Sequence, residues 1–219
     1  MARRLKLDIP GPDWRVGVAE AAECGFAALF AGDVARPLPL VVDLGFGRGE
    51  FLLALAAASP HAAFVGVELS FKRTVKMARR LARTPLRNVR LVQGRAEQVV
   101  REALPDASVA CFWINFPDPW PKKRHARRRL IQPELAALLA RKLVPGGALR
   151  IATDDPDYAA WIDAVLREVA DLENRYAPDP FRPAEAGRLP TAYELEWRAQ
   201  GRALHFFHYA SATRTDEAR

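Results

Sequence analysis

Short apolar runs, several of them rich in β-branched residues, alternate with segments of helical pattern through most of this chain. These runs occupy residues 40–44, 63–68, 89–93, 109–115 and 149–152. Each is long enough for one strand that is buried on both faces, and a helical stretch separates it from the next run. Strands that alternate with helices form a parallel sheet with helices on both faces. The sequence therefore predicts an α/β fold with a doubly wound, mostly parallel sheet.

The intervals between these runs, and the segment after the last one, supply the predicted helices, at residues 50–58, 71–83, 96–103, 133–143 and 158–170. Three prolines within residues 116–129 predict a loop there. Residues 172–176 and 204–209 are expected to form late antiparallel strands. The chain of 219 residues shows no internal repeat and no second domain. We therefore expect an N-terminal extension at residues 1–36 and a single domain at residues 37–219.

A doubly wound sheet binds its ligands beyond the carboxyl ends of its strands, where the strand order reverses. In this sequence the residues able to do chemistry follow the ends of the predicted strands. They are Gly45 to Gly49, Glu68, Asn115 to Trp120, and Thr153 with Asp154. This coincidence predicts that the active site lies at that edge of the sheet.

The segment Gly45-Phe-Gly-Arg-Gly49 has the character of a nucleotide-binding loop. Glycines let the backbone turn tightly and approach a ligand closely. The dinucleotide fingerprint requires a third small residue where this chain has Glu50, so an NAD-dependent oxidoreductase is a distant alternative. The acidic Asp43 before the loop fits an S-adenosylmethionine site better. Glu68 suits a ribose diol, because a carboxylate accepts hydrogen bonds from both hydroxyls.

The most specific stretch is Asn115-Phe-Pro-Asp-Pro-Trp120-Pro121. Its X-Pro bonds stiffen the backbone on both sides of Asp118, so one carboxylate and one large aromatic ring are held at the sheet edge. Residues 122–129 follow with six lysines and arginines and no acid, a composition typical of phosphate binding.

These motifs resemble those of the tRNA (guanine-N7)-methyltransferases of bacterial type. The resemblance rests on Gly45-Phe-Gly-Arg-Gly, Asn115-Phe-Pro-Asp-Pro-Trp, Lys123-Arg-His-Ala-Arg-Arg-Arg, Thr153-Asp154 and Thr191-Ala-Tyr-Glu194, and it extends from about Val41 to Gly201. It implies the Rossmann-like fold of class I S-adenosylmethionine-dependent methyltransferases, with S-adenosyl-L-methionine as cofactor. It also implies that the chain forms 7-methylguanosine in tRNA.

The resemblance further implies roles for individual residues. Asp118 corresponds to the acid between cofactor and guanine and is the candidate catalytic residue. The cofactor-binding positions are Asp43, Gly45, Gly47, Gly49, Glu68, Arg95 and Asn115. The substrate-binding positions are Lys122, Asp154, Thr191, Tyr193 and Glu194. The RNA-binding positions are Arg124, His125, Arg127, Arg128 and Arg129.

Two residues depart from the pattern of the family. Arg95 stands where an aspartate usually recognises the adenine amino group, and a guanidinium cannot accept a hydrogen bond from an amine. Adenine recognition then falls to the backbone or to Glu97. Glu196 stands where a basic residue is usual. These departures keep two alternatives open: a divergent paralogue that methylates another acceptor, and a non-catalytic RNA-binding descendant.

The formal net charge of +7 is concentrated in two segments. Residues 69–96 carry nine basic residues and no acid, and residues 122–129 carry six more. Without these segments the rest of the chain has a net charge of −8. An acidic body with two basic segments predicts a polyanionic partner, here tRNA.

Other partners and classes of protein are not expected. Two cysteines rule out a disulfide framework or a cysteine-rich zinc site, and no metal is predicted. No signal peptide or membrane-spanning segment is predicted, so we expect a cytoplasmic protein. We expect it to act as a monomer or homodimer.

Overall fold

The computed structural model describes residues 6–34 and 37–212, apart from the side chain of Lys123. The chain divides into two compact units, Met1–Leu104 and Pro105–Arg219, which are described separately.

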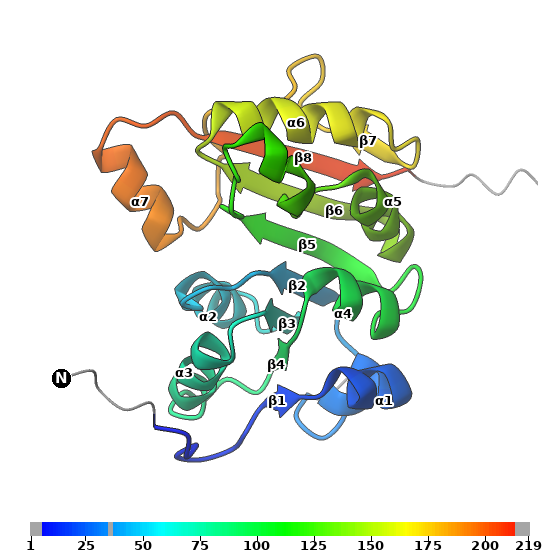
Figure 1. The fold of residues 1–219 in the computed structure, drawn as a ribbon. Helices are drawn as coiled ribbons and strands as arrows, with labels where there is room; N and C mark the ends of the chain where they lie inside the picture. Colours follow the sequence, from blue (N-terminus) through cyan, green and yellow to red (C-terminus); the bar gives the residue numbers. More distant parts are fainter. Residues whose placement is uncertain (1–5, 35–36, 213–219) are drawn as a thin grey trace, which may run out of the picture. The chain divides into compact units, whose positions relative to one another are not determined.

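The first unit contains a parallel sheet with the strand order β1-β4-β3-β2 (Figure 1). Its strands are β1 (Arg15–Val16), β2 (Leu40–Leu44), β3 (Ala63–Glu68) and β4 (Val89–Gln93). Its helices are α1 (Val18–Phe30), α2 (Glu50–Ala58), α3 (Phe71–Leu81) and α4 (Ala96–Glu102). All six residues of β3 are buried, as expected of a central strand. Side chains from α2, α3, β3 and β4 form one core, which includes Leu52, Phe64, Met77 and Leu91.

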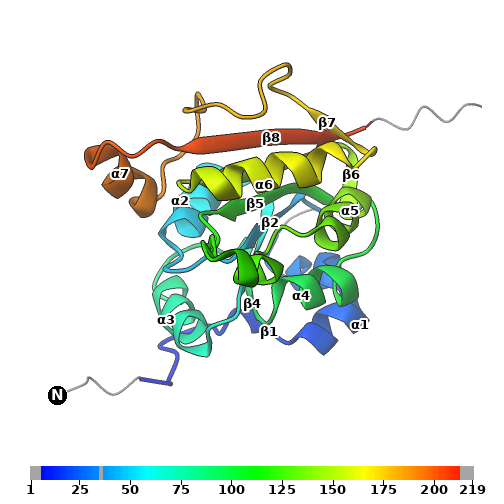
Figure 2. The ribbon, with the colours of Figure 1, turned by 45° about the horizontal axis from the view of Figure 1, so that its top comes forward.

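The second unit begins with two parallel strands and ends with antiparallel ones (Figure 2). Its strands are β5 (Val109–Asn115), β6 (Leu143–Thr153), β7 (Leu172–Asn174) and β8 (His205–Ser211), in the order β5-β6-β8-β7. Its helices are η1 (Lys123–Arg128), α5 (Pro133–Lys142), α6 (Pro156–Arg167) and α7 (Ala192–Ala199). Helix α7 lies beyond the ends of β5 and β6 to which their arrowheads point (Figure 1).

The predicted strands at residues 40–44, 63–68, 89–93 and 109–115 are confirmed at both ends. Other segments differ from what the sequence pattern predicted. β6 begins at Leu143 rather than at residue 149, because the Pro145-Gly-Gly147 segment continues the strand. The predicted loop at residues 116–129 contains the 3₁₀ helix η1. Helix α1 and strand β1 lie in the predicted N-terminal extension, and β1 pairs with β4.

Local sequence explains where several helices begin. Ser70 accepts a hydrogen bond from the backbone N–H of Arg73 at the start of α3, and Asp155 accepts one from Tyr158 at the start of α6. These side chains satisfy backbone donors that a helix leaves without partners at its first turn. No helix within residues 6–34 and 37–212 is both long and apolar enough to cross a bilayer.

Candidate active site

The loop after β2 is held in a conformation that favours glycine. Gly45, Gly47 and Gly49 have φ angles of +83°, +59° and +79°. A Cβ atom at Gly45 would meet nothing within 4 Å, whereas one at Gly49 would lie 2.3 Å from Met77 Sδ. A side chain at Gly49 would therefore have to displace Met77 of α3. At Gly45 and Gly47 the glycine leaves the backbone open to close approach by a ligand.

Glu68 is tied to this loop. Its side chain is 6% exposed, and its Oε2 accepts a hydrogen bond from the Gly47 backbone N–H at 3.0 Å. Its Oε1 accepts one from the Ser70 N–H at 2.9 Å. Because a carboxylate has about four acceptor positions, both oxygens keep capacity for ligand hydroxyls. Asp43 lies in β2, before the glycine loop, and is 2% exposed.

These features fit an adenosine-containing cofactor. The open backbone at Gly45 and Gly47 matches a ligand that approaches the loop closely, and the fixed Glu68 carboxylate matches a ribose diol. Leu69, which follows Glu68, is 61% exposed and offers a flat apolar contact. Sequence reasoning missed Leu69, although its place directly after the strand-ending acid was a usable signal.

Arg95 makes no close contact with the cofactor loop in this unit. It stands at the residue before α4, its side chain is 70% exposed, and its Nη2 lies 3.9 Å from Glu97 Oε1. The side chains of Arg95 and Glu97 therefore remain accessible from solvent.

In the second unit, the segment after β5 is a constrained loop. Phe116 and Trp120 have positive φ angles of 51° and 46°, which non-glycine residues rarely adopt. The Phe116 N–H donates to the Ala152 carbonyl at 2.8 Å, which fixes the start of the loop. Asp118, between these two residues, is exposed. A strained loop that presents one exposed carboxylate is a common arrangement at functional sites.

Arg129 anchors the other end of this loop. It is 9% exposed, and its Nε donates to the Pro119 carbonyl at 2.9 Å. Its guanidinium carbon lies 5.1 Å from the centre of the Tyr158 ring and 5.6 Å from that of Trp161. The pKa of the Tyr158 hydroxyl is raised to about 12, mainly by burial and to a small extent by the charge of Asp118. Tyr158 is therefore neutral, and its oxygen accepts from the Ile131 N–H at 3.0 Å.

The rest of the basic run lies at the surface. Lys122, Arg124, Arg127 and Arg128 are exposed, and His125 is half-buried. The Arg128 guanidinium stacks over the Trp120 ring at 5.0 Å, and His125 meets the same ring edge-on at 5.9 Å. Among the predicted RNA-binding residues, the structure therefore separates the buried Arg129 from three exposed arginines, Arg124, Arg127 and Arg128.

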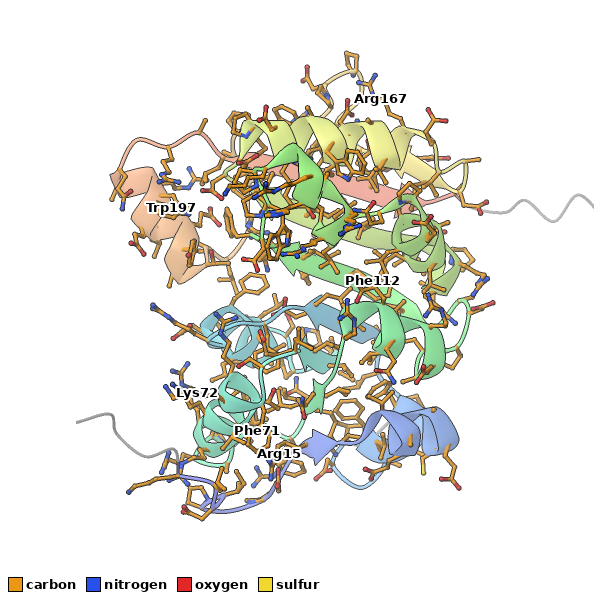
Figure 3. The ribbon with its side chains drawn as sticks, in the orientation of Figure 1. Arg15, Phe71, Lys72, Phe112, Arg167 and Trp197 are labelled. Atoms are coloured by element: carbon orange, nitrogen blue, oxygen red, sulfur yellow. The ribbon has the colours of Figure 1, made fainter. Side chains whose placement is uncertain are left out.

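Helix α7 carries the predicted substrate-binding segment. Thr191 caps the helix by accepting from the Glu194 N–H at 2.9 Å. Tyr193 is 52% exposed and stacks on Phe116, with ring centres 6.2 Å apart. Trp197, labelled in Figure 3, packs with Phe116 against residues from β6 and β8. The structure thus brings the Thr191–Glu194 segment to the loop that carries Asp118.

Glu194 is enclosed by arginines. Its Oε2 accepts from Arg188 Nε at 3.2 Å and its Oε1 from Arg198 Nη2 at 3.1 Å, and its side chain is 5% exposed. Arg188 also donates through Nη2 to Asn115 Oδ1 at 2.6 Å. This bond fixes the amide orientation and leaves the buried Asn115 Nδ2 without an acceptor among the described residues. Sequence reasoning missed Arg188, because nothing in the proline-rich segment distinguishes it from other arginines.

Asp154 follows β6 and is half-buried. Its Oδ2 accepts from Arg202 Nη1 at 3.0 Å, and Arg202 in turn lies 3.8 Å over the Trp197 ring. The Asp154 side chain therefore lies at the same edge of the second unit as α7.

Comparison with known proteins agrees with these features. A family model described as "Putative methyltransferase" matches residues 37–207. A tRNA (guanine-N(7)-)-methyltransferase of Halorhodospira halophila is 39% identical over 90% of this chain and 84% of its own length. One of Syntrophotalea carbinolica is 34% identical over 93% and 85%. The solved structure of a SAM-dependent methyltransferase from Aquifex aeolicus covers 80% of this chain and 82% of its own, with a TM-score of 0.55 and 13% identity. The predicted class I methyltransferase fold is thereby confirmed, and the chain belongs to the tRNA (guanine-N7)-methyltransferase family.

Proposed function

We propose that this chain methylates N7 of a guanosine in tRNA, with Asp118 as the carboxylate that stabilises the reacting purine. Bound S-adenosyl-L-methionine supplies a methyl group on a positively charged sulfur. The guanine N7 carries a free lone pair, so the attack needs no general base. The purine gains positive charge during transfer, and a fixed carboxylate beside the ring stabilises that charge. The observation that carries this proposal is the strained, anchored loop that presents Asp118.

Apart from Asn115, the predicted cofactor-binding residues belong to the first unit. We assign the ribose hydroxyls to Glu68, whose orientation two backbone donors fix. The open backbone of Gly45 and Gly47 accommodates the methionyl part, and Leu69 contacts the adenine ring. In this proposal Arg95 lies at the adenine position without accepting from its amino group, and apolar contact with Leu69 takes over part of the recognition.

Guanine recognition falls to side chains of the second unit. The unpaired Asn115 Nδ2 is a donor for an acceptor atom of the base or the cofactor. Asp154 accepts from the N1–H and amino edge, and Tyr193 with Phe116 offers aromatic surface. Glu194 already binds two arginines, so it contributes mainly by holding α7 in place. Lys122, Arg124, Arg127 and Arg128 contact phosphates.

The test is methyl transfer to unmodified tRNA from labelled S-adenosyl-L-methionine, followed by nucleoside analysis. We expect 7-methylguanosine. Cofactor binding without 7-methylguanosine would favour a paralogue acting on another acceptor. Calorimetry that shows RNA binding but no cofactor binding would select the non-catalytic alternative.

A further inference from the structure

Helix α3 has one buried and one strongly basic side. Thr74, Val75, Met77, Ala78 and Leu81 are buried against the first unit. The exposed residues on the helix and just after it are mostly cationic: Lys72, Arg73, Lys76, Arg80 and Arg83. Figure 3 labels Lys72 on the side of α3 that faces away from the strands of its unit. We call these five residues the α3 basic face.

Part of the basic segment at residues 69–96 does not belong to this face. Arg90 is 4% exposed and donates to the Leu29 carbonyl at 2.6 Å. Arg79, whose side chain is 14% exposed, pairs with Asp8 at 3.0 Å. Helical spacing puts Arg79 on the same side of α3 as Lys72 and Lys76, but the chain around Asp8 covers the Arg79 side chain.

The α3 basic face is only partly neutralised. Arg80 pairs with Glu50 at 3.3 Å, and Arg73 lies 3.7 Å from Glu68. Within residues 6–34 and 37–212, Lys72, Lys76 and Arg83 have no carboxylate within salt-bridge distance. The excess positive charge is therefore open to solvent.

The helix dipole favours Arg80 in the last turn of α3, but the charge pattern at the start of the helix does not favour the helix itself. Lys72 and Arg73 stand in the first turn, where the helix dipole disfavours cations. Lys72 and Lys76 are four residues apart, and like charges at that spacing repel on a helix surface. An ordinary solvated face would carry acids among its bases. A local pattern that works against stability points to a function outside the fold.

We propose that the α3 basic face binds the phosphodiester backbone of the tRNA substrate. Cations four residues apart on a helix are separated by about 6 Å along its axis, a spacing comparable to that of phosphates along one RNA strand. The α3 basic face also lies next to the glycine loop of the first unit. Ser70 caps the start of α3, and Arg80 Nη1 donates to the carbonyl of Arg48 in that loop at 3.1 Å. Arg48 is itself exposed. This inference rests on the proposed function, which supplies the identity of the polyanion.

The test uses the full chain with the double substitution Lys72→Glu and Lys76→Glu. We expect tRNA affinity to fall at least about tenfold at low salt. The slope of log affinity against log salt should decrease in magnitude by about 2, because two phosphate contacts are lost. The matched control carries Arg101→Glu and Arg167→Glu, which change the charge equally at exposed positions on α4 and α6. Its affinity should fall much less.

Three further measurements distinguish the loss of phosphate contacts from a general loss of folding or cofactor binding. In the double variant, cofactor affinity measured by calorimetry should stay at the wild-type value, and the midpoint of thermal unfolding should not fall below it. The variant with Lys72→Arg and Lys76→Arg should retain tRNA affinity. Equal losses in the double variant and the control would overturn the inference. If the wild-type enzyme forms 7-methylguanosine while the double variant binds tRNA normally, only this inference fails. If the wild type forms none and does not bind tRNA, both proposals fail.

Discussion

Arg129 Nε donates a hydrogen bond to the carbonyl oxygen of Pro119 at 2.9 Å. The last arginine of the basic run thus holds the residue that follows Asp118. Because Arg129 stacks on Tyr158 and Trp161 of α6, the loop is fixed to a rigid helix of the same unit. We therefore expect Arg129 to act as a positioning residue, in contrast to its exposed neighbours in the basic run.

Arg129→Lys is expected to lower kcat about 100-fold, because lysine cannot keep both the stacking and the directed bond, and small displacements of a reacting group are costly. The tRNA affinity and its salt slope should change little. Arg127→Ala is the contrasting variant: its loss of one phosphate contact should raise KM for tRNA and reduce the salt slope by about 1. Steady-state kinetics and binding titrations at several salt concentrations measure both. A reduced salt slope with unchanged kcat in Arg129→Lys would contradict the positioning role.

Asp118→Asn keeps the size of the side chain and removes its charge. We expect turnover to fall by about 100- to 1,000-fold, the usual cost of losing one charge-stabilising group. Binding of tRNA should remain nearly intact, and Asp118→Ala should behave in the same way. If both variants lost tRNA binding together with turnover, Asp118 would have a structural role in the loop instead.

Gly45→Ala and Gly49→Ala test the glycine loop. Both positions have positive φ, so each substitution should cost about 1 kcal/mol of backbone strain. Gly49→Ala also places a Cβ 2.3 Å from the Sδ of Met77, which is 1% exposed and closely surrounded. Its further cost should be about 1–3 kcal/mol. Urea unfolding measures both. Equal destabilisation of the two variants would show that Met77 adapts freely.

The buried Arg188–Glu194 pair suits a double-mutant cycle. Arg188 is 2% exposed at its side chain, so Glu194→Gln leaves a buried cation with one less charged partner. We expect destabilisation of about 3 kcal/mol. Arg188→Met combined with Glu194→Gln should cost at least about 1 kcal/mol less than the sum of the single variants, because neither charge is then left alone. If the costs of the two single variants simply added in the double variant, Arg188 and Glu194 would not be coupled, and Arg198 alone would compensate the charge of Glu194.

His208 on β8 predicts a pH dependence of stability. Burial lowers its pKa to about 4, with help from the positive charges of Arg150 and Arg175. In the unfolded chain this histidine has its ordinary pKa of about 6.5. Between pH 6.5 and pH 4 the unfolded chain therefore binds a proton at His208 that the folded chain does not bind. The free energy of unfolding therefore decreases as the pH falls from about 6.5 to about 4.

The measurement compares wild type with His208→Gln in denaturant titrations between pH 4.5 and 7.5. The difference in slope isolates His208 from the carboxylates that titrate nearby. Parallel pH profiles of the two proteins would refute the assignment.

The order of strands and helices could be read from the sequence, because it depends on short-range patterns. Four strands have the predicted ends, since a buried strand needs a continuous apolar run with turn residues beyond it. The glycine loop, Glu68 and the Asp118 loop were found in the same way, because strand ends fix their place. Helix α1 was not predicted from the sequence. It contains Gly25, whose φ of 72° is not helical and interrupts the helix.

Which charged side chains are buried was decided by the tertiary structure alone. Arg128 and Arg129 are adjacent in one basic run, yet only Arg129 is buried, because Tyr158 and Trp161 come from another helix of the fold. Arg90 pairs with Asp33, which lies 57 positions earlier in the chain. Arg188 binds Glu194 and also Asn115, which lies 73 positions earlier in the chain. Local sequence determines backbone conformation, whereas the burial of a charge requires compensating partners that only the folded chain brings together.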